Sequence, residues 1–167
     1  MIDRPSHAAD HQPPDPGAAS ASPHRLAALL LGACAAYQLA IGLYFAMLRP
    51  PLLAEDLRFL GTASGALAAA APRLERWLQL VFVVLGGQMA AVGVLTAALA
   101  LRLSRGHAPD RRELALLGGA GALSVGTMSV VNLVLASDFR WLLILPVATW
   151  AGAIALAARD AGRLNER

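Results

Sequence analysis

Two short segments of the chain share the pattern Asp-apolar-Arg-aromatic-Leu, and its charged side chains could do chemistry. Asp56 and Arg58 stand in Asp-Leu-Arg-Phe-Leu, and Asp138 and Arg140 stand in Asp-Phe-Arg-Trp-Leu. A carboxylate at a membrane interface can act as an acid or base, and it can also pair with a nearby arginine. The pattern predicts a cluster in which Asp56 reaches Arg140 and Asp138 reaches Arg58. Helix-end electrostatics and arginine snorkelling are the simpler explanation of the same residues.

A second set of polar residues lies inside long apolar stretches. An amide or hydroxyl in hydrocarbon needs a hydrogen-bond partner, so these side chains are predicted to point into a helix bundle and bond across it. They either hold helices together or line a ligand cavity, and Gln88 and Asn132 are the first candidates for such a lining. This candidate polar lining comprises Gln38, Ser129, Gln88 and Asn132.

No catalytic, cofactor or metal site is predicted. The four histidines, His7, His11, His24 and His107, all lie outside the apolar stretches, which disfavours a membrane haem. The single cysteine, Cys34, excludes an intramolecular disulfide and dithiol redox chemistry. The chain also holds no Ser-His-Asp set and no phosphate-binding loop motif.

Four uninterrupted stretches without any charged residue must position these groups. Each has 18 to 25 residues, and at about 1.5 Å per residue such a helix crosses a hydrocarbon core of roughly 30 Å, allowing for tilt. The fold class predicted is an all-α membrane protein with four transmembrane helices in one bundle. The spans are placed at about 26–48, 77–101, 114–136 and 141–158.

The spans divide the chain into three parts. Residues 1–24 are rich in Pro, Ala and Ser without an apolar run and are predicted to be a disordered tail. Residues 25–159 form the transmembrane domain, and 160–167 form a short C-terminal tail.

An amphipathic helical segment is predicted between the first two spans. Pro50 and Pro51 end the first span, and leucines then recur at spacings of three and four. Gly61 and Gly65 interrupt this pattern, so two short helices are expected as readily as one. The segment is too short to cross a bilayer and is expected to lie at the interface or over the bundle end.

Arginine placement predicts the orientation. Of the arginines near span ends, eight lie on the side of the termini and five on the other side, which favours cytoplasmic termini. A chain without lysine, rich in Ala, Leu and Gly, indicates a bacterial inner membrane protein. The net charge of +3 is spread over span ends, which disfavours nucleic-acid binding.

Two further features allow more than one interpretation. Pro146 is predicted to kink the fourth span, and Trp150 one turn later could then wall a cavity. Small residues recur at helical spacing in every span, which suits either packing within the bundle or a dimer face.

Three function classes follow. The first is a non-enzymatic accessory or structural subunit, with the lipid bilayer and either another copy or a membrane protein as partners. The second is a binder or carrier of an apolar or lipid-like molecule. The third is a membrane enzyme acting on lipid, with Glu55, Asp56 or Asp138 as acid or base.

Overall fold

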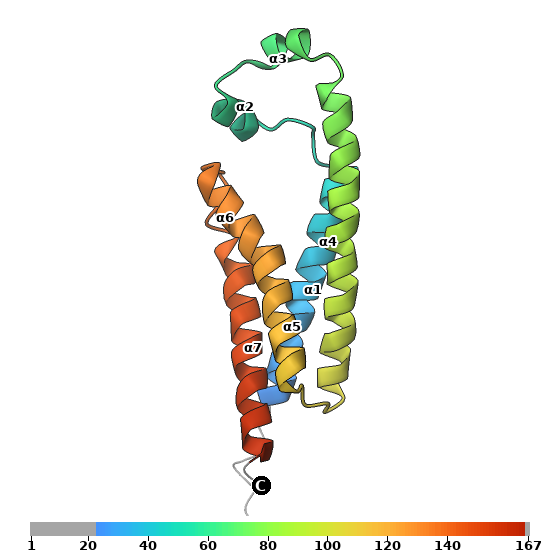
Figure 1. Cartoon of the computed structure of the whole chain (residues 1–167), viewed down its shortest axis with the longest axis vertical. Coiled ribbons are helices and arrows are strands. Elements are labelled where there is room, and N and C mark those ends of the chain that lie inside the picture. Colours follow the sequence, from blue (N-terminus) through green and yellow to red (C-terminus); the bar gives the residue numbers. More distant parts are fainter. Residues whose placement is uncertain (1–22, 166–167) are drawn as a thin grey trace, which may run out of the picture.

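The computed structural model describes residues 23–165, which form helices and connecting turns with no β-strand among them. Long helical rods lie side by side, and short helices cross one end (Figure 1). The described chain begins and ends at the opposite end (Figure 1). The helices are α1 (Pro23–Met47), α2 (Ala54–Leu60), α3 (Ser64–Ala70), α4 (Leu74–Ser104), α5 (Arg111–Gly121), α6 (Thr127–Val134) and α7 (Ile144–Asn165), with a π-helical stretch, Ala122–Gly126, joining α5 to α6.

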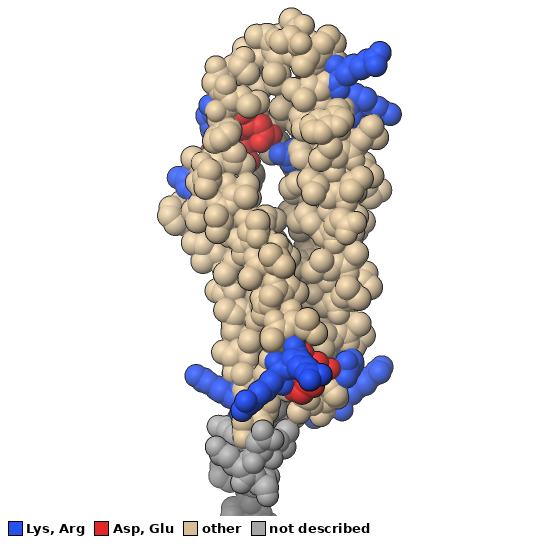
Figure 2. Space-filling view, viewed as in Figure 1, with Lys and Arg blue, Asp and Glu red and all other residues tan. Residues whose placement is uncertain are grey.

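Three of the rods are long and apolar enough to cross a membrane: His24–Met47, Leu74–Ser104 and Arg111–Val134. The fourth apolar helix, Ile144–Arg159, is shorter. Charged side chains gather toward the two ends of the molecule, and the surface between them carries none in the view of Figure 2. The predicted all-α class is therefore confirmed, and three candidate membrane-spanning helices suggest a multi-pass membrane protein.

Glycines allow α1 and α4 to pack with their backbones in contact. A Cβ added to Gly42 would lie 2.6 Å from Ala90 N and 2.7 Å from Gly86 O. At Gly93 it would lie 2.9 Å from the backbone N of Leu39. Since lipid supplies no hydrophobic drive for association, close approach of this kind is how membrane helices gain packing energy. These small residues are therefore used within the bundle.

The best-packed part of the bundle lies in the half that holds the described chain ends. There Leu31, Leu103 and Leu117 are buried together with Trp150 of α7. The Trp150 indole lies against Gly121, where no side chain would fit, and its N–H donates to Leu117 O at 3.1 Å. Trp150 is thus a core residue and does not wall a cavity.

The prediction that Pro146 kinks a helix is wrong. The apolar stretch that begins at Trp141 starts as a turn, and α7 begins only at Ile144. Pro146 therefore lies in the first turn, where a missing N–H costs little because that N–H has no intrahelical partner. The Leu142 carbonyl, which a proline inside a helix would leave without its partner, accepts a hydrogen bond from the Leu145 N–H at 3.3 Å.

The segment between α1 and α4 forms two short helices, as the glycines allowed. Gly61 ends α2 with φ +64, a left-handed conformation that glycine adopts without strain. At the C-terminal end, α7 continues to Asn165, beyond the point where the sequence predicts a tail. Most of the predicted N-terminal tail, residues 1–22, lies outside the described residues.

Candidate functional site

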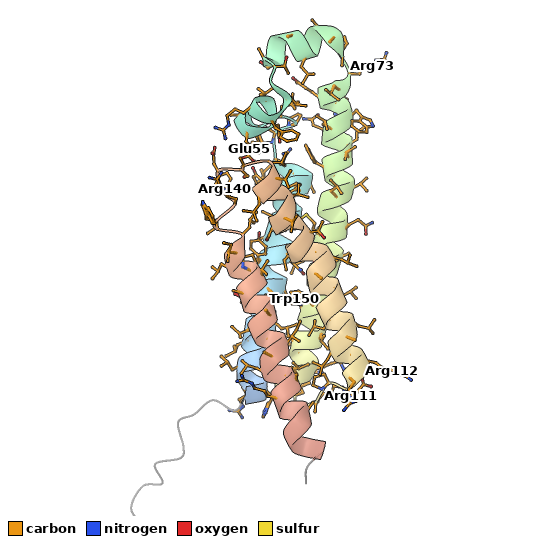
Figure 3. The ribbon with its side chains drawn as sticks, turned by 60° about the vertical axis from the view of Figure 1, so that its left-hand side comes forward. Glu55, Arg73, Arg111, Arg112, Arg140 and Trp150 are labelled. Atoms are coloured by element: carbon orange, nitrogen blue, oxygen red, sulfur yellow. The ribbon has the colours of Figure 1, made fainter. Side chains whose placement is uncertain are left out.

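Glu55 of α2 ties the first loop to the turn after α6. Its side chain is only 8% exposed, although α2 lies outside the long apolar helices. Its Oε2 accepts a hydrogen bond from Ser137 Oγ at 2.9 Å and one from the Asp138 backbone N–H at 3.1 Å. Ser137 Oγ also accepts the Phe139 N–H at 3.2 Å, so this carboxylate organises the turn. Figure 3 shows Glu55 between α2 and the end of α6.

Arg58 and Asp138 form the second link between the same two segments. One guanidinium nitrogen of Arg58 lies 3.0 Å from each carboxylate oxygen of Asp138. The repeated Asp-apolar-Arg-aromatic-Leu pattern predicts this pair, and the structure brings the two residues together. Their side chains are 58% and 64% exposed, so the pair contributes about 0–1 kcal/mol.

Asp56 pairs with Arg49, at the end of α1, and not with Arg140 as predicted. The two side chains meet at 3.1 Å and are only 19% and 10% exposed. Asp56 also accepts the Leu53 N–H at 2.8 Å and so caps the start of α2. The Arg49 guanidinium lies 3.9 Å from the ring centroid of Phe82 on α4, a cation–π distance. Arg49 therefore connects α1, α2 and α4.

Arg140 is engaged with its own turn. Its guanidinium donates to the carbonyl of Ala136 at 2.9 Å and to that of Ser137 at 3.3 Å. It also lies 5.6 Å from the ring centroid of Trp141. These bonds keep the Arg140 guanidinium at the turn after α6, whereas Asp56 is paired with Arg49.

Gln38, a predicted lining residue, joins three helices at the middle of the bundle. Its Nε2 donates to Ser124 Oγ in the π-helical stretch at 3.2 Å. Its Oε1 accepts from Thr96 Oγ1 of α4 at 3.3 Å. Gln38 is 3% exposed, and both ends of its amide have partners, so it holds helices together.

The other predicted lining residues are not brought together with Gln38. Ser129 is buried and donates to the Leu143 carbonyl at 3.0 Å, which ties α6 to the turn before α7. Asn132 donates to Met128 O one turn earlier on its own helix at 2.9 Å. Gln88 lies on an exposed face of α4 and forms no side-chain hydrogen bond among the described residues. Gln88 therefore lies outside the bundle interior, and a ligand cavity lined by Asn132 and Gln88 remains a prediction.

An apolar pocket of about 300 Å³ lies beneath α2. Below the acidic side chains at this end, the space-filling view shows an opening through the molecule (Figure 2). Asp56 is the one charged residue in the pocket wall, and it is already paired. The apolar wall residues are Pro51, Leu52, Phe59, Leu60, Leu74, Leu78, Phe82 and Leu135.

The carboxylates of this end are arranged to hold loops in place. Glu55, Asp56 and Asp138 each accept hydrogen bonds from a neighbouring segment. At the other end, Asp110 and Glu113 cap the first turn of α5 reciprocally, through bonds of 2.7 and 3.2 Å. Across the described residues, no three His, Cys, Asp or Glu side chains are grouped so as to hold a metal ion.

Sequence reasoning missed several members of this arrangement. Ser137 and Thr96 are ordinary hydroxyl residues, and Arg49 precedes a proline pair with no pattern that marks its partner. Only the position of Ser137, directly before the second Asp-apolar-Arg run, was a usable signal. Comparison with protein-family models, curated proteins and solved structures finds no match to this chain.

Proposed function

We propose that this chain is a four-span protein of the bacterial inner membrane, with both termini in the cytoplasm, that acts as a non-enzymatic accessory or structural subunit. The fourth span consists of the apolar part of α7, Ile144–Arg159, together with the apolar turn before it. A helix of this length covers about 24 Å, and local thinning of the bilayer accommodates the difference.

The observation that carries the structural role is the use made of the loop carboxylates. An interfacial enzyme needs an acid or base that is free to meet its substrate. Here the buried Glu55 carboxylate accepts two hydrogen bonds. Asp56 accepts one from Arg49 and one from the Leu53 N–H at the start of α2. This arrangement supports a structural role, in which the carboxylates hold α2 over the end of the bundle, in preference to a catalytic one.

Binding of an apolar or lipid-like molecule is the second candidate. The pocket beneath α2 favours it, because about 300 Å³ is at the small end of ligand pockets and its wall is almost wholly apolar. The opening below α2 would let an apolar or lipid-like molecule dissolved in the membrane reach this pocket from the side (Figure 2).

Purification in mild detergent followed by native mass spectrometry tests the proposal. Self-assembled copies or a complex with another membrane protein would support the structural role, and the chain alone would count against it. One small molecule retained per chain, lost in Leu78→Trp but kept in the control Leu85→Trp, would favour the second candidate. Leu78 lines the pocket, whereas Leu85 is exposed outside it. Turnover of an added phospholipid that Asp56→Asn abolishes would overturn the proposal.

A further inference from the structure

The face of α4 that points away from α1 has no partner among the described helices. Gly86 and Gly93 mark the side that packs on α1. At 100° per residue, the residues of the opposite side recur at alternating spacings of four and three. This outer seam consists of Val84, Gln88, Ala91 and Leu95, and all four are exposed, Val84 by 63% and Leu95 by 72%.

Gln88 makes this seam unusual for a surface that faces lipid. It is the only polar residue of the seam and lies near the middle of the apolar rod Leu74–Ser104, with seven apolar residues on each side. Its amide has no hydrogen-bond partner among the described residues, whereas the amide of Gln38 on α1 is bonded at both ends. Transfer of an amide from water to a hydrocarbon that forms no hydrogen bonds costs several kcal/mol of free energy. The Gln88 side chain therefore requires a hydrogen-bond partner.

We infer that a second copy of this chain covers the outer seam of α4, with the two Gln88 amides hydrogen-bonded to each other across a two-fold axis along the membrane normal. A carboxamide carries both donors and an acceptor, so the same side chain complements itself. A two-fold interface places one patch against its own copy, and with its axis along the membrane normal it keeps both copies in the same orientation.

The spacing of the seam supports the same partner. Residues at alternating intervals of four and three form the contact line of two helices that wind around each other. One polar residue within such a line fixes register, because only the matched alignment pairs the amides. The small side chain of Ala91 beside Gln88 leaves room for close approach of the backbones.

Disulfide cross-linking in native membranes tests the geometry with matched controls. Val84→Cys and Leu95→Cys, each on a Cys34→Ala background, place a thiol on the seam and leave Gln88 intact. Val83→Cys and Val94→Cys are their controls, because each is one residue away, exposed, and turned by about 100° at nearly the same depth. The seam variants should form cross-linked dimers on mild oxidation, and the controls should not.

Replacement of the amide tests the hydrogen bond itself. Gln88→Leu should raise the dissociation constant of the dimer in lipid vesicles about threefold to thirtyfold, the range that matches an interhelical hydrogen bond in a membrane. Gln79→Leu, an exposed glutamine of α4 outside the seam, should leave the constant unchanged.

Four outcomes would overturn the inference. They are a monomer at every concentration tested, equal cross-linking of seam and control positions, cross-linking of the seam only to a different protein, and equal dissociation constants for Gln88→Leu and wild type. The inference rests on the proposed placement of α4 in the membrane. Membrane fractionation of the Cys34→Ala chain checks that placement separately, so a failure of the dimer can be told from a failure of the membrane assignment.

Discussion

Ser137 donates a hydrogen bond of 2.9 Å to Glu55, a residue 82 positions earlier in the chain. The serine is fully buried and the glutamate nearly so. This bond and the neighbouring bond from the Asp138 N–H join α2 to the turn between α6 and α7. A further polar link between these two segments is the exposed Arg58–Asp138 pair. Glu55 is therefore the buried carboxylate that attaches α2 to this turn.

Removal of that carboxylate should destabilise the protein clearly. Glu55→Ala is expected to lower the free energy of unfolding by about 1.5–3 kcal/mol, because a charged acceptor is lost and two donors are left without it. Thermal or denaturant unfolding in detergent, followed by tryptophan fluorescence, measures the change. Glu75→Ala removes an exposed carboxylate at the start of α4 and should stay within about 0.5 kcal/mol of wild type. Equal effects of the two substitutions would contradict the stabilising role of the Glu55 hydrogen bonds.

The two ion pairs at this end of the bundle should differ in strength. Double-mutant cycles on stability are expected to give a coupling above about 1 kcal/mol for Arg49 with Asp56 and below about 1 kcal/mol for Arg58 with Asp138. The physical reason is exposure, since the first pair is largely shielded from water and the second is more than half exposed. Suitable variants are Arg49→Gln and Asp56→Asn, with Arg58→Gln and Asp138→Asn as the exposed counterpart. The reverse order of coupling would show that shielding does not govern these pairs.

Adjacent glycines of α4 should respond in opposite ways to the same substitution. In Gly86→Ala the new methyl would meet the Gly42 carbonyl and Ala46, and the expected loss is about 1–3 kcal/mol or more. In Gly87→Ala the methyl would meet nothing within 4 Å, and better helix propensity should leave stability equal or raise it by up to about 1 kcal/mol. Chemical denaturation in detergent compares the two variants. A loss at Gly87 that matches the loss at Gly86 would mean that the α1–α4 contact is looser than the structure indicates.

The orientation in the membrane is accessible to thiol labelling. Cysteine at position 62, between α2 and α3, is expected to react with an impermeant reagent in intact cells on a Cys34→Ala background. Cysteine at position 20 or 166 should react only after the membrane is opened, because the arginine excess lies on the side of the termini. Labelling of the terminal positions alone in intact cells would invert the topology.

The sequence predicted the helices well because a charge-free run of about 20 residues has few alternatives. It did not predict which face of each helix points inward. Gln38 and Gln88 both lie among apolar residues on every side, so no periodic pattern separates a buried face from a lipid-facing one. The inward position of Gln38 follows from the glycine contacts that fix α1 against α4, which is tertiary information.

Of the contacts in the site, only the one between loops at the same end of the bundle was predictable from the sequence. Arg58 and Asp138 lie in loops at the same end of the bundle, so the repeated pattern predicted their pairing. The partner of Asp56 was not predictable, because Arg49 is positioned by stacking on Phe82 of a different helix. The turn before α7 was also missed, since Trp141, Leu142 and Leu143 carry no helix-breaking signal.

The π-helical stretch Ala122–Gly126 changes the rotational phase of the rod that runs from α5 to α6. Its wider turn takes up about one residue more than an α-helical turn, so the faces presented before and after it are offset by about 100°. This offset lets Leu117 and Gly121 meet Trp150 while Ser129 reaches the Leu143 carbonyl. A deletion of one residue within 122–126 would restore a regular helix without introducing a charge or a proline. It would nevertheless turn Ser129 away from α7, so the length of this stretch matters more than the identity of its residues.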